Sequence, residues 1–192
     1  MEIAHKGNTL KIIRGIYNFN SVNEDTALTI GSFDGVHLGH QMVLNDLKAA
    51  ALKRGLKSAV MIFEPQPQEY FSGEKAPARL MRLRDKLKTF CDFGIDIVVC
   101  LRFDDSLRNL TADEFISIII NGLYAKHLII GDDFRFGCDR SGDFKMLQNS
   151  GKLNNFTVQQ MRTFDVGDKR VSSTSVRKAL IESKFDLAAK LL

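Results

Sequence analysis

Short apolar runs rich in β-branched residues alternate with helix-patterned stretches along most of this chain, and this alternation restricts the possible folds more than any other feature. We expect buried strands at residues 27–30, 57–63, 95–101, 127–130 and 156–161. Runs this apolar are typical of parallel strands covered on both faces. Strands joined by helices require crossover connections, so the pattern predicts an α/β fold, a Rossmann-like parallel sheet flanked by helices.

The stretches between these runs carry helical signals. Apolar residues recur at helical spacing behind the first expected strand and again over residues 83–91. Thr111 and Glu114 have the spacing of a capping box, which predicts a helix start. Residues 174–192 are typical of two short helices. Because no repeat, low-complexity tract or linker interrupts the chain, we expect residues 1–192 to form a single domain.

Composition excludes several classes of protein. A chain of 192 residues that is 44% hydrophobic can bury a core without disulfides or a metal. Its 27 basic and 23 acidic residues are interleaved, which favours a mixed-charge surface and no nucleic-acid partner. The sequence has neither a secretory leader nor an apolar run of the roughly 18 residues that cross a bilayer, so we expect no membrane association.

The three cysteines, Cys91, Cys100 and Cys138, fit neither a disulfide framework nor a Cys-x-x-Cys metal site. This usage favours a reducing, cytoplasmic location. Cys91 and Cys100 lie in apolar-periodic stretches and are expected to be packed, whereas Cys138 lies in a polar loop and is the candidate reactive thiol.

Residues 31–40 directly follow the first expected strand, and ligands of parallel sheets bind beyond the carboxyl ends of strands. The glycines of this segment allow close backbone approach, and the helix behind it directs free amides and its positive dipole end to the same point. His37 and His40 fall on one side of the first helical turn and can donate to phosphate oxygens. We therefore expect a nucleotide phosphate site that includes Gly31, Ser32, Phe33, Asp34 and Gly39.

Other interpretations of these residues remain open. A lone histidine is usually a satisfied core or surface residue, but two histidines framed by glycines argue against that reading. Zinc would need further ligands, and the sequence offers no obvious third one, so metal ligands stay unassigned. The glycine spacing matches neither the dinucleotide fingerprint nor the Walker loop. Asp34 can orient an imidazole, hold magnesium through water, or form a turn.

Two later segments also carry polar chemistry. Ser172, Ser173 and Thr174 precede a short helix that contains Arg177. N-capping needs only one hydroxyl, so the excess of donors suits the β and γ phosphates of a nucleotide, with capping as the alternative. The loop after the fourth expected strand suits a flat heterocycle with a phosphate, or else a solvated turn with core phenylalanines; its candidate residues are Asp133, Phe134, Arg135 and Phe136.

Together these segments resemble a known family. Residues 31–40 are similar to the His-x-Gly-His signature of the nucleotidylyltransferase superfamily, and their Phe-Asp-Gly-Val-His form resembles the FMN adenylyltransferase (FAD synthetase) module of bacterial bifunctional riboflavin kinase/FMN adenylyltransferases. Three more segments agree in order and spacing: 63–67 with Phe-x-Pro-His-Pro, 131–137 with Gly-x-Asp-Phe-Arg-Phe-Gly, and 172–177 with Ser-Ser-Thr-x-Ile-Arg. Gln66 departs from the family histidine, and Val176 replaces isoleucine.

The resemblance implies transfer of AMP from ATP to FMN, with Mg²⁺ accompanying ATP and with FAD and pyrophosphate as products. It places His37 and His40 on the triphosphate, with His40 at the α-phosphoryl oxygens. It also implies that Ser172, Thr174 and Arg177 hold pyrophosphate, and that Gln66 and the loop at 133–136 lie near the flavin or the nucleotide. The alternatives are adenylyl or cytidylyl transfer to another phosphorylated acceptor, and a non-catalytic nucleotide-binding module.

The resemblance implies a C-terminal riboflavin kinase domain in family members, and we expect these 192 residues not to include it. We therefore expect no riboflavin phosphorylation by this chain, with a kinase domain either lost or covalently attached beyond it. The hypothesis depends on one spatial condition. The histidine pair and the serine-rich turn, which lie far apart in sequence, must face the same polyanion.

Overall fold

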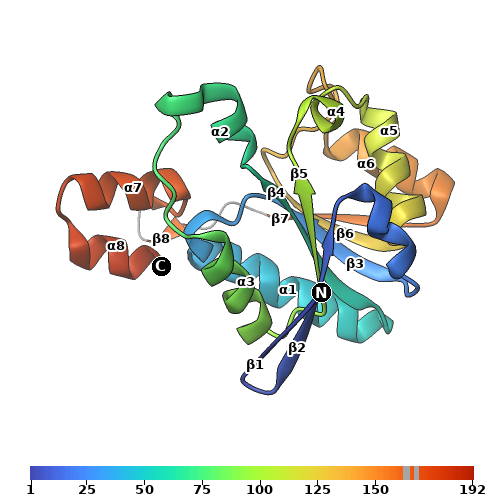
Figure 1. Cartoon of the computed structure of the whole chain (residues 1–192), viewed down its shortest axis with the longest axis horizontal. Coiled ribbons are helices and arrows are strands. Elements are labelled where there is room, and N and C mark those ends of the chain that lie inside the picture. The colour runs from blue at the N-terminus through green and yellow to red at the C-terminus, as the bar shows by residue number, and fades with distance from the viewer. Residues whose placement is uncertain (162–164, 167–168) are drawn as a thin grey trace.

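A seven-stranded sheet forms the centre of the molecule, in the order β1-β2-β5-β4-β3-β6-β7 (Figure 1). The computed structural model describes residues 1–161, 165–166 and 169–192. The strands of this sheet are Glu2–His5 (β1), Asn8–Arg14 (β2), Thr26–Ile30 (β3), Lys57–Glu64 (β4), Ile97–Arg102 (β5), Ala125–Gly131 (β6) and Thr157–Met161 (β7). β1 and β2 pair antiparallel, whereas the other neighbouring strands pair parallel. A separate pair, Asp165–Val166 (β8) and Lys169–Arg170 (β9), is antiparallel.

Helices connect the parallel strands. The α-helices are Leu38–Arg54 (α1), Pro67–Ser72 (α2), Leu83–Asp92 (α3), Asp105–Arg108 (α4), Ala112–Ser117 (α5), Phe144–Asn154 (α6), Ser173–Ile181 (α7) and Phe185–Leu191 (α8). Shorter helical turns span Ile16–Ser21 (η1), Asp34–Val36 (η2), Gly73–Lys75 (η3) and Ile118–Gly122 (η4). The predicted capping box is present at the start of α5, where the Glu114 N–H donates to Thr111 Oγ1 at 3.2 Å.

Alternate residues of the central strands pack into two apolar layers, one on each face of the sheet. Along β4, Val60 and Ile62 join the layer that contains residues of α1 and α3. Ala59 and Met61 join the opposite layer, which contains residues of η1, α4, α5 and α6. Cover on both faces explains why the strand runs are continuously apolar. The predicted parallel α/β sheet flanked by helices is confirmed.

The five expected strands are present, with ends shifted by at most two residues, but the sheet also contains β1 and β2. These strands form a hairpin whose two turn residues, Lys6 and Gly7, have φ values of 49° and 80°. Positive φ at both positions fits a two-residue hairpin turn, and this hairpin was not predicted from the sequence. β2 pairs with β5 and thereby attaches the hairpin to the sheet.

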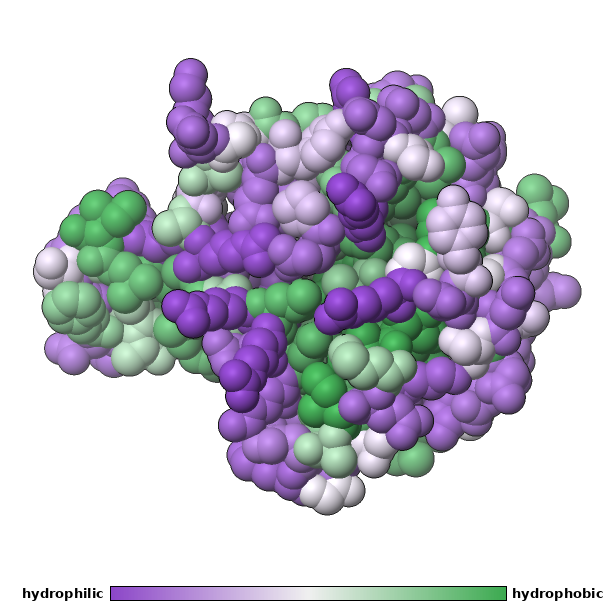
Figure 2. All heavy atoms as spheres, in the orientation of Figure 1, coloured by the Kyte–Doolittle hydropathy of each residue, from purple (hydrophilic) through white to green (hydrophobic). Residues whose placement is uncertain are grey.

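The predicted tail of two short helices is confirmed as the hairpin of α7 and α8, which lies to one side of the sheet (Figure 1). Its small apolar core is centred on Val171, Val176 and Leu191. Ile181 and Phe185 are exposed, and Figure 2 shows hydrophobic atoms gathered at this end of the molecule. Nowhere in the described ranges is a helix both long enough and apolar enough to span a bilayer.

Candidate active site

The structure brings the three candidate segments together around one cavity of about 520 Å³ at the carboxyl ends of β3 and β6. From the first segment, it is lined by Gly31, Ser32, Phe33, His37, Gly39 and His40. The loop after β6 contributes Asp133, Phe134 and Arg135, and the start of α7 contributes Ser172 and Ser173. The other five candidates, Asp34, Gln66, Phe136, Thr174 and Arg177, do not line it.

The loop between β3 and α1 has an unusual backbone. Phe33 and Val36 adopt φ values of 48° and 39°, and Gly35 lies between them at 79°. Positive φ is unfavourable for residues with a side chain, above all for β-branched valine. Such a conformation persists only where surrounding contacts hold it in place. One such contact is the hydrogen bond that the Val36 carbonyl accepts from Gln41 Nε2 at 3.0 Å.

The two imidazoles form a stacked pair, with ring centroids 3.7 Å apart and an interplanar angle of 16°. His37 Nδ1 accepts a hydrogen bond from the backbone N–H of His40 at 3.3 Å and so caps α1. A ring nitrogen that accepts carries no proton, so neutral His37 holds its proton on Nε2. Burial lowers the pKa of His37 to about 4, which leaves it a neutral hydrogen-bond donor at pH 7.

His40 has one buried polar atom with nothing to bind. Its Nδ1 lacks a hydrogen-bond partner among the residues that the structure describes. The ring also packs against Phe33, with centroids 4.8 Å apart. Burial is the largest cause of a pKa well below the usual imidazole range, followed by the nearby His37 and Lys86. The site therefore presents two neutral imidazoles at the N-terminus of a helix.

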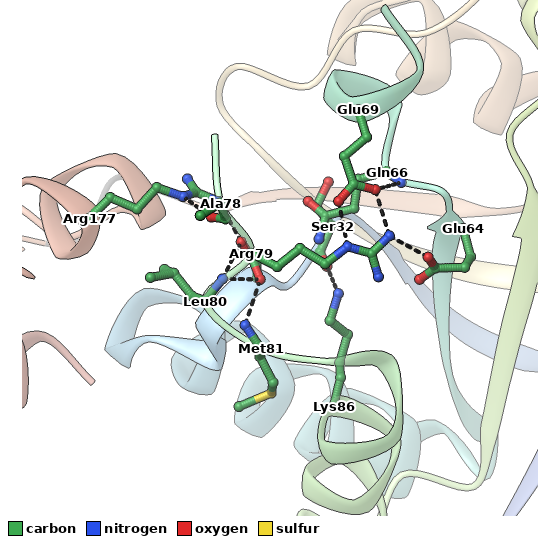
Figure 3. Close-up of polar contacts among 11 residues, drawn as sticks. Ser32, Glu64, Gln66, Glu69, Ala78, Arg79, Leu80, Met81, Lys86 and Arg177 are labelled. Atoms are coloured by element: carbon green, nitrogen blue, oxygen red, sulfur yellow. Dashed lines mark hydrogen bonds and ion pairs between the residues drawn. The ribbon is translucent and has the colours of Figure 1, made fainter. Parts of the chain in front are cut away.

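Asp34 and Arg177 form an ion pair between the β3–α1 loop and α7, in which the Asp34 side chain is buried. Figure 3 shows the Arg177 side chain extending toward Ala78. The Asp34 carboxylate accepts from the backbone N–H groups of Leu80 and Met81 at 3.1 Å and pairs with the Arg177 guanidinium. Arg177 Nε donates to the Ala78 carbonyl at 2.7 Å. In this structure the two side chains join the β3–α1 loop to residues 78–81 and to α7.

The serine-rich turn performs the capping that its sequence allowed. The Ser175 N–H donates to Ser172 Oγ at 3.1 Å, and the Ser172 N–H donates to Ser175 Oγ at 2.9 Å. Ser173 Oγ donates to the Asp34 carbonyl at 2.9 Å. Thr174 is exposed on the first turn of α7. Only Ser172 and Ser173 therefore combine these structural contacts with a place on the cavity wall.

Phe136 behaves differently from its neighbours in the loop after β6. It is buried, and its ring lies 5.4 Å from that of Phe115 and 5.5 Å from that of Phe134. A Cβ on Gly142 would lie only 2.5 Å from the Phe136 ring, so glycine is required where the two strands of this loop meet. Phe136 thus anchors the loop whose residues Phe134 and Arg135 face the cavity.

Gln66 lies beside the cavity at the start of α2. Its backbone N–H donates to Glu69 Oε2 at 2.8 Å. The side chain is buried, and its Nε2 has no partner within the described part of the chain. Its neighbours Phe63 and Pro67 line the cavity. An unmatched amide donor therefore lies close to the cavity wall.

Three basic residues near the cavity were not among the candidate site residues predicted from the sequence. Arg140 and Arg170 line it, and Arg170 pairs with Asp132 and Asp133 at 3.4 and 3.6 Å. Lys86 is buried behind it and donates from Nζ to the Ser32 carbonyl at 2.6 Å (Figure 3). The available signal for Lys86 was its place on the apolar face of α3, where a charged residue is unexpected.

The described residues contain no group of three or more His, Cys, Asp or Glu side chains arranged to hold a metal ion. The polar groups of the cavity wall are instead suited to an anion. They comprise neutral imidazole donors, a helix N-terminus, hydroxyls and guanidinium groups.

Comparison with known proteins agrees with this chemistry. The bifunctional riboflavin kinase/FMN adenylyltransferases of Escherichia coli (strain K12) and Pseudomonas fluorescens are 48% identical over 185 residues and 47% identical over 184 residues. Each match covers 95% of this chain and 59% of the relative, so the chain spans about 59% of the length of these curated relatives.

A solved structure described as a macrolide-efflux protein from Streptococcus pneumoniae shares the fold, with a TM-score of 0.79 and 24% identity over 95% of this chain and 60% of that one. The family model described as FAD synthetase matches residues 19–175, which include the loop of the histidine pair, the loop after β6 and the start of α7. The chain belongs to the FAD synthetase family.

Proposed function

We propose that this chain transfers AMP from ATP to FMN and releases pyrophosphate, so that FAD is formed. The observation that carries the proposal is the cavity itself. It brings the stacked histidine pair, the start of α7 and the aromatic loop after β6 to one place at the carboxyl end of a parallel sheet. Membership in the FAD synthetase family supports the same reaction.

In the proposed reaction, a phosphate oxygen of FMN attacks the α-phosphorus of ATP, and the bond from that phosphorus to the β-bridging oxygen breaks. The protein contributes positioning and charge stabilisation. His37 donates from Nε2, and His40 is our proposed donor to the α-phosphoryl oxygens. Ser172 and Ser173 at the start of α7 and Arg170 line the cavity, and we propose that they hold the departing pyrophosphate.

Thr174 and Arg177 do not line the cavity, so their proposed contacts with pyrophosphate would require a rearrangement. Arg177 is bound to Asp34 and to the Ala78 carbonyl, so it would have to leave both to reach a phosphate. On the flavin side, we propose contacts from Phe134 and Arg135, with Asp133 at the cavity edge. The unpartnered Gln66 Nε2 is our candidate for a further donor near Pro67.

We propose Mg²⁺ as the companion of the triphosphate. Because the described residues offer no cluster of carboxylates, an ion held mainly by phosphates and water fits this wall better than one held by the protein. The metal would neutralise phosphate charge. A cytoplasmic location is also part of the proposal, supported by three unpaired cysteines, of which Cys91 and Cys100 are buried.

Pyrophosphate release tests the proposed function. The protein is incubated with Mg²⁺, ATP and single acceptors: FMN, riboflavin, and non-flavin phosphorylated acceptors such as nicotinamide mononucleotide and phosphopantetheine. We expect release with FMN alone and equimolar FAD, with no FMN formed from riboflavin. Pyrophosphate release only with another acceptor would contradict FMN as the substrate. ATP binding without pyrophosphate release in the presence of any acceptor would contradict an enzymatic role.

A further inference from the structure

Lys86 is a buried cation that the proposed reaction leaves unexplained. Lys86 lies on α3 and is only 2% exposed to solvent. Its Nζ donates to the Ser32 carbonyl at 2.6 Å. Figure 3 shows its side chain rising from the helix to the β3–α1 loop. A fully buried lysine is rare unless it is paired with an acidic group.

The acidic groups around Lys86 are bound to other cations. Arg79 pairs with both Glu64 and Glu69, and Asp34 pairs with Arg177. Among the described residues, Lys86 itself makes no ion pair; its polar contact is the Ser32 carbonyl. Burial lowers the pKa of Lys86, while Asp34 and then Glu64 oppose that change and favour the charged ammonium.

The contact of Lys86 reaches the cavity through one peptide group. Ser32 lines the cavity and begins the loop in which Phe33 and Val36 hold unfavourable positive φ values. A planar trans peptide places its carbonyl and N–H on opposite sides. Binding the Ser32 carbonyl toward α3 therefore directs the Phe33 N–H away from α3. Phe33 in turn packs against the His40 ring.

The positive charge of Lys86 also acts directly on His40. It is among the groups that hold the pKa of His40 below its usual range, after burial and His37. A buried ammonium without an acidic partner is costly by itself. A polyanion in the adjacent cavity would reduce that cost, because the field of a buried charge is only weakly screened.

We propose that Lys86 is a positioning residue for polyphosphate binding: its ammonium fixes the Ser32 peptide of the histidine loop and supplies, from behind the cavity wall, positive charge that the bound triphosphate neutralises. The inference rests on the proposed function only in taking ATP as the ligand. It requires neither FMN nor turnover.

The test compares Lys86→Met and Lys86→Gln with Lys88→Met, a matched control at an exposed lysine on the same helix. Methionine removes both the charge and the donor, whereas glutamine removes the charge but can still donate to Ser32. Calorimetry measures the binding of Mg·ATP and of inorganic pyrophosphate without FMN. Titration of the imidazole ¹⁵N signals by NMR measures the pKa of His40, and urea unfolding measures stability.

We expect Lys86→Met to bind both ligands at least about tenfold more weakly, because it removes both the positive charge behind the cavity wall and the hydrogen bond that fixes the Ser32 peptide. The pKa of His40 should rise in both Lys86 variants, because a nearby positive charge has been removed. The free energy of unfolding of Lys86→Met should be unchanged or higher, because an apolar side chain replaces a buried unpaired charge. A side chain with a purely structural role would show reduced stability and unchanged ligand affinity in the folded protein.

Ligand affinities and a His40 pKa equal to those of wild type and Lys88→Met would overturn the proposal. Should Lys86→Met fail to fold, Lys86→Gln decides by the same criteria. Wild type that binds pyrophosphate in a Lys86-dependent manner but forms no FAD would contradict the proposed function and still support the role of Lys86.

Discussion

His37 and His40 show at the scale of single residues how local geometry sets chemical capacity. The cap from the His40 N–H to His37 Nδ1 leaves the proton of neutral His37 on Nε2. Burial favours the neutral form of both rings. The pair can therefore donate hydrogen bonds at neutral pH without adding positive charge before the nucleotide arrives.

Replacement of His40 tests its proposed contact with the α-phosphoryl oxygens. We expect His40→Ala to lower kcat about 100- to 1,000-fold, the usual effect of removing one donor to developing charge. Steady-state FAD formation measures it, with His5→Ala as a control on the distant β1 strand. Turnover of His40→Ala close to wild type would remove His40 from the mechanism.

The lowered pKa of His37 predicts a pH dependence of folding stability. The imidazole titrates at about 4 in the folded chain and near 6.5 when unfolded, so between these values the unfolded state binds more protons. The contribution of His37 is present above pH 6.5 and is lost as the pH falls toward 4, by up to about 3 kcal/mol. His37→Asn keeps an N-cap but cannot titrate, so its urea stability should fall less between pH 7.5 and 4.5 than that of wild type. Equal losses in the two proteins would contradict the assignment.

At the scale of elements, the first turn of α1 combines helix formation with placement of the histidine rings. A Cβ on Gly39 would lie 3.3 Å from two atoms of the His37 ring, which is closer than ordinary van der Waals contact. Alanine is otherwise the better helix residue by roughly 0.5–1 kcal/mol. Stability and ring placement therefore make opposing demands at this position.

The Gly39→Ala variant separates these demands. We expect its thermal stability to be maintained and its kcat/KM for FAD formation to fall about 10- to 100-fold, because displaced catalytic groups lose productive geometry. Asp46→Ala, on the exposed face of the same helix, is the control and should retain full activity. A fully active Gly39→Ala protein would show that the His37 ring can shift without consequence.

The β1–β2 hairpin illustrates how element prediction depends on the type of signal. β3, β4, β5 and β6 were evident because most of their residues are buried, which leaves long apolar runs. β1 carries two exposed residues in four, so its pattern was weaker. The turn at Lys6 and Gly7 was the remaining local signal, but it was not used, so this hairpin was not predicted.

At the scale of the whole molecule, Asp34 joins the sheet to the C-terminal helical hairpin. Its carboxylate accepts from the N–H groups of Leu80 and Met81 and pairs with Arg177, and its carbonyl accepts from Ser173 Oγ. The apolar core of the hairpin is small and includes contacts with Leu38 and Leu80, and these polar contacts add to that attachment. Regions with few buried contacts open at lower free energy than the main core.

Asp34→Ala should therefore destabilise the protein by about 3–5 kcal/mol, the usual result of removing one partner from a buried ion pair. Hydrogen exchange followed by mass spectrometry should show the largest increase in α7 and α8. Asp133→Ala breaks a more exposed pair with Arg170 and should cost less than about 1 kcal/mol. Similar losses in the two variants would contradict a central role for the Asp34 link.

The sequence by itself determined the parallel α/β architecture, the glycine-framed histidine turn and the family, because apolar periodicity and motif spacing are local properties of the chain. It also indicated Ser172, Phe134 and Arg135, which do line the cavity. Tertiary structure alone decided which partner each charged side chain takes. Asp34 meets Arg177 and Lys86 meets Ser32 across 143 and 54 positions of the chain, and such pairings depend on how distant elements pack, which no local pattern encodes.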